Sequence, residues 1–327
     1  MKKLILALLV LLAVPGIFLY MILRQPVAVT TAETFVEIPR GSSTLRIGEI
    51  LEKAGLLRSP LQAVAYRVFH PRVKFQAGDY VFRSEKNVEA ILRKIAHGDV
   101  YFAELTIAEG FSLYDIARIV EEQHLLRSAD FLAAARDPAL IRDLDPQAPT
   151  LEGYLYPATY RLPKRLTAQS LCLRLTRQFR EVWRTLNSHD GPHRTVTLAS
   201  LVEKESAIAE ERPRIAGLFS NRLKQGMKLE CDPTVIYAAL VENRFRGTIY
   251  KSDLASESLY NTYRHAGLPP GPIANPGLQS LKAALNPADT DAVFFVAEPG
   301  GTGHHIFSTS LRDHSRAVEA YRRGQKP

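Results

Sequence analysis

The sequence predicts an α+β protein with an N-terminal transmembrane helix. Three observations lead to this fold class. The chain opens with a long uncharged apolar run, a strand–helix–helix–strand pattern then occurs twice, and the second half reads as helices with one pair of short strands. The 327 residues suffice for two or more domains, each with a core of its own.

Residues 1–24 are expected to form a cytoplasmic tip and a transmembrane anchor. Two lysines precede an uncharged run over residues 4–23, and Arg24 ends it. A run of about 20 residues crosses a hydrocarbon core at about 1.5 Å per residue. Basic residues before the run favour a cytoplasmic N-terminus, so the bulk of the chain should lie outside the cytoplasm. Cleavage as a signal peptide is the alternative, because small residues occur at 28–32.

An internal repeat follows the anchor. The tetrad Leu-Leu-Arg-Ser at 56–59 recurs at 125–128, and Gly41 and Gly110 keep the same offset. Each copy reads as a strand, a turn, an amphipathic helix, a second helix after the tetrad and a closing strand. The first copy covers residues 34–100, with strands expected at 35–38 and 78–82 and the first helix at 45–53. The second copy covers residues 101–162, with strands expected at 102–107 and 153–156 and the first helix at 113–122.

Such a small α+β unit resembles the LysM pattern, which binds N-acetylglucosamine polymers. Many βααβ units bind nothing, so the sequence leaves open whether either copy binds sugar. Further helices are predicted at 87–96 and 167–186, with a loop at 189–193. The last domain is placed at 163–327.

Glu205 stands in the apolar stripe of the next predicted helix. It takes a slot where helical spacing calls for an apolar residue. A carboxylate facing a core is costly unless it is paired or protonated. Apolar surroundings raise the pKa of a Glu toward neutrality, as a general acid requires, whereas a structural Glu would pair with a buried Arg or cap the backbone. Spacing alone leaves both interpretations open. The stripe consists of Leu198, Leu201, Val202, Ile208 and Ala209.

Two more helices are predicted after the Glu205 helix. Pro213 suits the first turn of one, and Gly226 suits its end. Asp232 suits the N-cap of the other, with Pro233 at its first position. Capping alone would explain Asp232.

The tetrad Tyr260-Asn261-Thr262-Tyr263 precedes a loop over residues 267–277 that is rich in Pro and Gly. Pro and Gly fix the shape of such a loop, and a polar and aromatic tetrad beside it suits a groove for sugar rings. An ordinary connection with Tyr263 in the core is the alternative.

A β-hairpin with strands at 293–296 and 305–308 is predicted near the end, followed by a helix at 311–322. His304 and His305 are adjacent on the returning strand. Because adjacent strand residues point to opposite faces, at most one of them should face a site.

The net charge and the motifs of the chain limit the binding partners and cofactors that can be expected. The formal net charge is +8, with Lys and Arg scattered, which suits an anionic membrane surface or polymer. No RNA-binding or zinc-finger pattern occurs, so nucleic acid is not expected. Without a CxxC or HExxH motif, neither a metal nor a cofactor is expected. Cys172 and Cys231 could form one bridge or remain two buried thiols.

A set of motifs in one order resembles the MltG/YceG-like endolytic murein transglycosylases, over nearly the whole chain. Many motifs in a fixed order are far more specific than any single one. They are Glu152-Gly153-Tyr154-Leu155, Val202-Glu203-Lys204-Glu205-Ser206, Asn221-Arg222-Leu223, Gly226-Met227-Lys228-Leu229, Asp232-Pro233-Thr234-Val235-Ile236-Tyr237, Tyr260-Asn261-Thr262-Tyr263 and Gly267-Leu268-Pro269-Pro270-Gly271-Pro272-Ile273.

The resemblance implies a single-pass inner-membrane protein with a lysozyme-like, α-rich catalytic domain in the periplasm. Such an enzyme would cut the β-1,4 bond between N-acetylmuramic acid and N-acetylglucosamine inside nascent peptidoglycan strands. It would leave 1,6-anhydro ends, terminate chain elongation and work beside peptidoglycan synthases. The resemblance makes Glu205 the catalytic acid, the residue that the helical stripe also selects. Substrate contacts are expected from Ser206, Glu230, Asp232, Asn261, Thr262 and Tyr263.

The chain departs from the family pattern at one position. Glu230 stands where family members commonly carry Gln, and Cys231 follows it. A second carboxylate near Glu205 could raise the pKa of Glu205 further or activate water, although a solvated Glu230 is the simpler interpretation. A membrane-anchored muramidase that uses water and a non-catalytic glycan-binding scaffold are therefore the alternatives to the transglycosylase.

Overall fold

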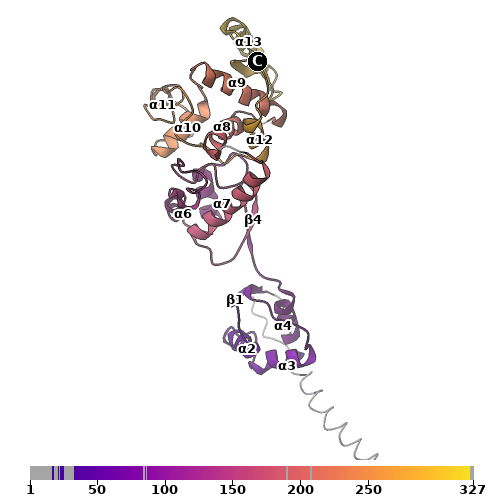
Figure 1. Ribbon diagram of the computed structural model, residues 1–327. Helices are drawn as coiled ribbons and strands as arrows, with labels where there is room; N and C mark the ends of the chain where they lie inside the picture. The colour runs from indigo at the N-terminus through magenta and orange to yellow at the C-terminus, as the bar shows by residue number, and fades with distance from the viewer. Residues whose placement is uncertain are drawn as a thin grey trace, which may run out of the picture. The chain divides into compact units, whose positions relative to one another are not determined.

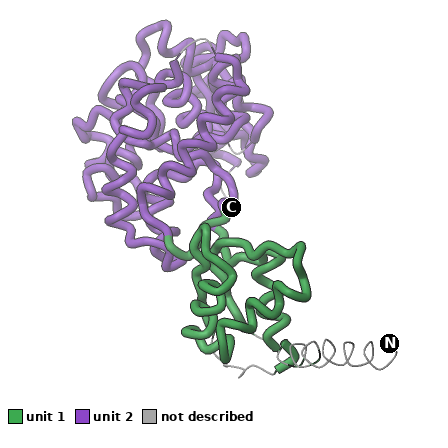
Figure 2. Tube along the Cα trace, turned by 60° about the horizontal axis from the view of Figure 1, so that its bottom comes forward, with its two compact units in different colours: residues 1–104, 161–165 green, residues 105–160, 166–327 purple. Residues whose placement is uncertain are grey.

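The computed structural model describes residues 17, 21, 23–25, 33–83, 85, 87–188, 191–206 and 208–324. Within these residues, no helix has both the length and the apolar character needed to cross a membrane. Most of the anchor predicted at residues 1–24 lies outside them. The described chain divides into two compact units, one of residues 1–104 and 161–165 and the other of residues 105–160 and 166–327 (Figure 2).

Unit 1 holds the first copy of the repeat, and its strand–helix–helix–strand order matches the prediction. Ser43 and Asn87 cap two of its helices through their side chains, as residues of these types do at N-caps. The two strands pair antiparallel, with Val36 opposite Tyr80. The elements are β1 (Thr34–Ile38), α2 (Thr44–Lys53), α3 (Leu61–Phe69), β2 (Gly78–Phe82) and α4 (Val88–His97).

The second copy has the same order of elements, but its closing strand was predicted in the wrong place. It comprises β3 (Ala103–Thr106), α5 (Leu113–Glu122), α6 (Ser128–Ala135) and β4 (Thr159–Leu162), and β3 pairs with β4. The predicted strand at 153–156 is instead buried irregular chain. The backbone N–H groups there bond elsewhere, that of Tyr154 to the Leu151 carbonyl and that of Leu155 to the Asn275 side chain.

The rest of unit 2 is α-rich. Helices α8, α9, α10 and α12 pack around one another, with α8 in contact with the other three (Figure 1). The predicted hairpin is confirmed as β5 and β6, paired antiparallel with Phe295 opposite Phe307. The elements are α7 (Ala168–Thr185), α8 (Pro192–Glu205), α9 (Arg212–Lys224), α10 (Asp232–Val241), α11 (Lys251–Leu254), α12 (Leu278–Leu285), β5 (Phe294–Ala297), β6 (His305–Ser308) and α13 (Leu311–Gly324).

Two predicted details need correction. The apolar stripe was expected to run on to Ile208, but α8 ends at Glu205 and a short 3-10 turn, Ala209–Glu211, follows. Asp232 was expected to be an N-cap, but Cys231 holds that position and Asp232 is the first helical residue. Residues 105–160 lie in the same compact unit as the chain from residue 166 onward, and the domain bounds 101–162 and 163–327 stay a prediction.

Cys172 and Cys231 are both buried free thiols, so the bridge considered from the sequence is not formed. Cys172 lies within α7 and Cys231 directly precedes α10. Burial raises the pKa of both thiols, to about 12 for Cys172. Such thiols pack as small apolar groups.

Gly153 joins α8 to the loop rich in Pro and Gly through close packing. Its φ of 87° lies in the left-handed region, and a Cβ there would meet Pro272 at 2.5 Å and Val196 at 2.8 Å. Gly226, after α9, has a comparable φ of 67° but open space around it. The two glycines therefore separate the cost of the backbone conformation from the cost of the packing.

We predict that Gly226→Ala costs about 1 kcal/mol of stability, the usual penalty for a left-handed residue with a Cβ. Gly153→Ala should cost about 2–4 kcal/mol, because overpacking is added to that penalty. Urea unfolding of the purified chain, followed by fluorescence of its single tryptophan, Trp183 in α7, measures unit 2. Equal costs for the two variants would contradict the packing described for Gly153.

Candidate active site

Glu205 is the last residue of α8 and sits half-buried beside the core of unit 2. The helix stops because Ser206 takes an extended conformation, and the Ser206 hydroxyl bonds both the N–H and the carbonyl of Ile208. A helix C-terminus carries partial negative charge, which disfavours an ionised carboxylate. The backbone alone therefore already favours the protonated form of Glu205.

The surroundings of Glu205 act in the same direction. Its pKa is raised, first because burial removes water from the carboxylate and then because the charge of Asp232 repels a second negative charge. The Cys231 thiol, which interacts with the carboxyl, and the charges of His305 and Arg222 oppose this shift without cancelling it. Among the described residues, none forms an ion pair with Glu205. The geometry thus favours the general acid over the buried structural pair considered from the sequence.

Glu203 and Lys204 fix the end of α8, so that Glu205 is held in place. Glu203 is 4% exposed; its carboxylate lies 2.9 Å from Arg212 and accepts the Gly277 N–H at 2.8 Å. Lys204 donates to the Gly110 carbonyl at 3.2 Å. A buried ion pair with its remaining lone pairs satisfied is a rigid connection. Glu203 therefore connects the loop rich in Pro and Gly to the end of α8.

Arg222 joins the hairpin to the chain that enters α10. Its guanidinium donates to the carbonyls of Val293 at 2.6 Å, Leu229 at 2.9 Å and Lys228 at 3.2 Å. Its burial lowers its pKa, and the guanidinium stays paired because these acceptors surround it. Glu230, whose carboxylate lies 3.6 Å away, is the nearest acidic group to it.

Glu230 lies at the surface. Its side chain is 52% exposed and its φ is 50°, in the left-handed region that costs a non-glycine residue energy. Its N–H donates to the Thr262 carbonyl at 3.3 Å. This placement fits the solvated interpretation of Glu230.

Asn261 and Thr262 are buried and use their polar atoms inside the protein. The Asn261 amide donates to the carbonyls of Ser256 at 2.7 Å and Leu254 at 3.0 Å. The Thr262 hydroxyl accepts the Cys231 N–H at 3.0 Å and bonds the Thr234 hydroxyl at 2.9 Å. The geometry gives both residues a supporting position behind the site, while the substrate contact expected of them stays a prediction.

Tyr263 and Asp232 present polar groups near Glu205. The Tyr263 hydroxyl donates to Asp232 at 2.7 Å, and Asp232 is exposed. Burial, and then the hydrogen bond to Asp232, raises the pKa of Tyr263, so its hydroxyl keeps its proton. This pair is accessible to a bound sugar, whereas Ser206 is buried and its hydroxyl is engaged with Ile208.

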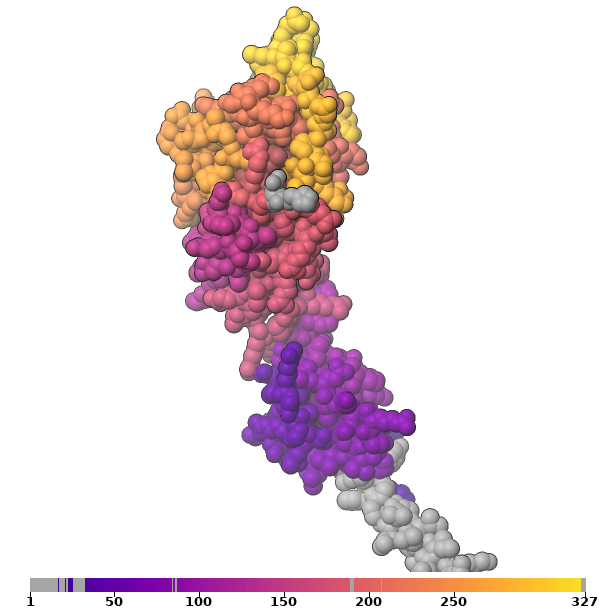
Figure 3. Space-filling view, viewed as in Figure 1, coloured from indigo at the N-terminus to yellow at the C-terminus, as the bar shows by residue number. Residues whose placement is uncertain are grey.

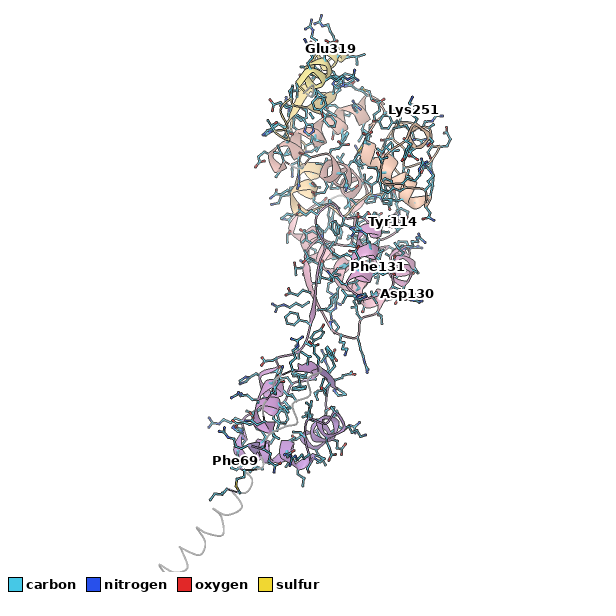
Figure 4. All side chains as sticks on the ribbon, turned by 180° about the vertical axis from the view of Figure 1, so that it is seen from behind. Phe69, Tyr114, Asp130, Phe131, Lys251 and Glu319 are labelled. Atoms are coloured by element: carbon cyan, nitrogen blue, oxygen red, sulfur yellow. The ribbon has the colours of Figure 1, made fainter. Side chains whose placement is uncertain are left out.

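The most deeply buried carboxyl of unit 2, Glu152, was not singled out from the sequence. It accepts the Leu113 N–H at 2.9 Å and the Asn275 amide at 3.0 Å, and burial raises its pKa to about 8. It also bonds Tyr237, whose ring packs edge-on to Tyr114 of α5. Tyr114 is labelled in Figure 4. The only signal in the sequence was the Glu-Gly-Tyr-Leu motif, because the partners of Glu152 are distant along the chain.

A glutamate with a raised pKa at a helix end, beside a rigid Pro-Gly loop in an α-rich domain, is the arrangement expected of a protein with an acid/base site. The sequence model of the YceG-like family matches residues 36–320. The chain therefore belongs to the YceG-like family.

Its relatives carry names that describe an activity. A Bacillus subtilis protein named endolytic murein transglycosylase is 33% identical, over 95% of this chain and 91% of its own length. A Streptococcus pneumoniae protein of the same name is 31% identical over 86% of this chain, which spans 57% of that relative. A crystal structure of a yceG-like protein from Listeria monocytogenes, 33% identical, covers 88% of this chain and 99% of its own with a TM-score of 0.55.

The raised pKa of Glu205 predicts a stability effect with a defined sign. A carboxyl whose folded pKa lies above its unfolded value makes the folded state less stable as pH rises through that interval. Glu205→Gln should therefore raise the urea midpoint of unit 2 at pH 8 and give a smaller gain at pH 4, where the wild-type carboxyl is largely protonated. A gain that is larger at pH 4 would contradict the raised pKa.

Proposed function

We propose that the protein is an endolytic peptidoglycan lytic transglycosylase. It cleaves the β-1,4 bond between N-acetylmuramic acid and N-acetylglucosamine within nascent glycan strands and leaves 1,6-anhydro-muramic ends. The observation that carries the proposal is the placement of Glu205, a half-buried carboxyl at the end of α8 that contacts the Cys231 thiol and forms no ion pair with a described residue. The names of the relatives supply the substrate class.

Glu205 performs both proton transfers in this mechanism. The protonated carboxyl donates to the glycosidic oxygen, the C1–O bond breaks, and N-acetylglucosamine leaves with a 4-hydroxyl group. The resulting carboxylate takes the proton of the muramyl C6 hydroxyl, and O6 bonds to C1. No water is consumed, and Glu205 ends the cycle protonated. One carboxyl is enough, whereas hydrolytic glycosidases flank the bond with two.

The polar groups next to Glu205 support the developing positive charge at C1. Asp232 and Tyr263 are the accessible pair near Glu205. The substrate's own acetamido group can share this task. Asn261 and Thr262 then act by holding the segment that bears Tyr263 and the chain that enters α10.

Hydrolysis is the second candidate, because Asp232 is an exposed carboxylate whose charge reaches Glu205. A carboxylate that activates water on the far face of the sugar would give reducing ends instead of anhydro ends. The bond from Tyr263 to Asp232 already occupies one of its oxygens, which favours the transglycosylase.

The remaining parts of the proposal concern location. Residues 1–24 anchor the protein in the inner membrane with the N-terminus in the cytoplasm, and the bulk lies in the periplasm near the synthases of nascent strands. The strand–helix–helix–strand order of both copies supports the LysM-like interpretation. The anchor brings the catalytic domain close to strands as they emerge, so that cleavage terminates elongation.

The test is mass spectrometry of un-crosslinked glycan strands incubated with the purified full chain, as wild type and as Glu205→Gln. We expect shorter strands with 1,6-anhydro ends from the wild type and a rate loss of at least about 10²-fold in the variant. Reducing ends from the wild type would establish the muramidase instead. Strands that bind but stay intact would point to a glycan-binding scaffold.

A second variant tests Glu230 separately. Because Glu230 is exposed and turned to Arg222, we expect Glu230→Gln to leave the ratio of anhydro to reducing ends unchanged and the rate within about threefold. A shift of the ratio in favour of anhydro ends would show that Glu230 activates water. Circular dichroism of both proteins controls for folding.

A further inference from the structure

The β5–β6 hairpin is fastened to the few residues that follow Glu205. Gly303, in the turn of the hairpin, lies against the side chain of Ile208. Glu211, at the end of the 3-10 turn, accepts the His305 N–H at 3.0 Å. In the space-filling view the C-terminal residues, in yellow, form a surface at one end of unit 2 (Figure 3). The first residue of β6 therefore sits next to the chain that leaves the catalytic helix.

The His305 ring is oriented by the same carboxylate. Its Nδ1 lies 2.7 Å from one Glu211 oxygen, while the other oxygen lies 3.1 Å from Nδ1 of His304. Burial alone would raise the pKa of Glu211, but the hydrogen bonds from the two histidines lower it, so Glu211 is ionised at neutral pH. An ionised carboxylate only accepts hydrogen bonds, so Nδ1 of His305 carries a proton.

The opposite ring nitrogen of His305 is left available. No described residue forms a hydrogen bond with Nε2, although the side chain is only 14% exposed. The rings of Phe295 and Phe307 wall the imidazole, with centroids 5.3 Å and 6.4 Å away. When Nδ1 carries the only proton, Nε2 is a hydrogen-bond acceptor. A carboxylate that orients one histidine nitrogen so that the other can act is the arrangement of many catalytic dyads.

His305 also lies close enough to Glu205 that, when the imidazole is protonated, its positive charge acts on that carboxyl. A purely structural role would need only the backbone N–H of His305 and the Nδ1 contacts, all of which Glu211 already receives. Nε2 is therefore a hydrogen-bond acceptor between two aromatic rings, close to Glu205, that a bound ligand can use.

We propose that Nε2 of His305 accepts a hydrogen bond from the muramyl residue bound at Glu205, and that Glu211 is the positioning residue that orients the ring. This rests on the proposed function. Two donors of the muramyl residue have the required chemistry, the C6 hydroxyl and the acetamido N–H. A bond to the hydroxyl would hold O6 near C1 until Glu205 takes its proton. A bond to the acetamido group would hold the carbonyl that supports C1.

Three substitutions separate this role from simple fastening. Asn places its amide where Nδ1 lies, so His305→Asn keeps the contact to Glu211 and loses the atom at Nε2. Gln reaches further, so His305→Gln keeps a polar atom near Nε2. His304→Gln is the matched control, because His304 directly precedes β6, is far more exposed than His305 and contacts the same Glu211.

The experiment measures single-turnover cleavage of un-crosslinked strands and the ratio of product ends for the wild-type full chain and each variant. We expect a loss of about 10–100-fold for His305→Asn, as for one lost hydrogen bond in the transition state, a smaller loss for His305→Gln, and less than about twofold for His304→Gln. An increased share of reducing ends would identify the hydroxyl as the donor. An unchanged ratio would identify the acetamido group.

Two results would overturn the inference. One is a wild-type rate in His305→Asn, because the Nε2 atom would then have no function. The other is equal loss in His305→Asn and His304→Gln, because fastening to Glu211 would then explain both. Failure of the wild type to cleave strands would instead overturn the proposed function, so the two failures are distinguishable.

Discussion

The structure of unit 2 depends on placing one carboxyl at the negative end of a helix and away from water. Glu205 ends α8, where the helix dipole, burial and the charge of Asp232 all favour its protonated form. A residue in that position destabilises the folded state when it ionises, so the surrounding contacts must hold it. The rest of the domain can be understood as the framework that keeps Glu205 in that position.

Three sets of hydrogen bonds form this framework. Glu203 joins α8 to Arg212 and to the loop at Gly277. Arg222 joins α9 to the hairpin and to the entrance of α10 through backbone carbonyls. Asn275 and Glu152 connect the same loop to the start of α5. Each uses a buried polar group that bonds to chain segments distant in sequence, which holds those segments together. The Pro and Gly residues of the loop restrict its backbone further.

The sequence predicted the elements well where periodicity and caps agree. The hairpin, α7 and α9, which has Pro213 in its first turn, lie where their patterns place them. It failed where tertiary contacts decide: apolar Ile208 continues the stripe of α8, yet the hydroxyl of Ser206 turns the chain after Glu205. Glu152 bonds Asn275, and Glu211 bonds His305, across long stretches of sequence, so no local pattern could pair them. Glu205 itself could be predicted because a carboxylate within an apolar helical stripe can be recognised from one short segment of sequence.

The most direct test of this account is an infrared or carbon-13 NMR titration of the Glu205 carboxyl in the purified full chain. The difference between wild type and Glu205→Gln isolates its signal from those of the other carboxyls. We expect a titration midpoint above the ordinary value for a glutamate, which is near pH 4.3. A midpoint at or below that value would mean that the carboxyl is ionised throughout the neutral range, and Glu205 could not then be the proton donor.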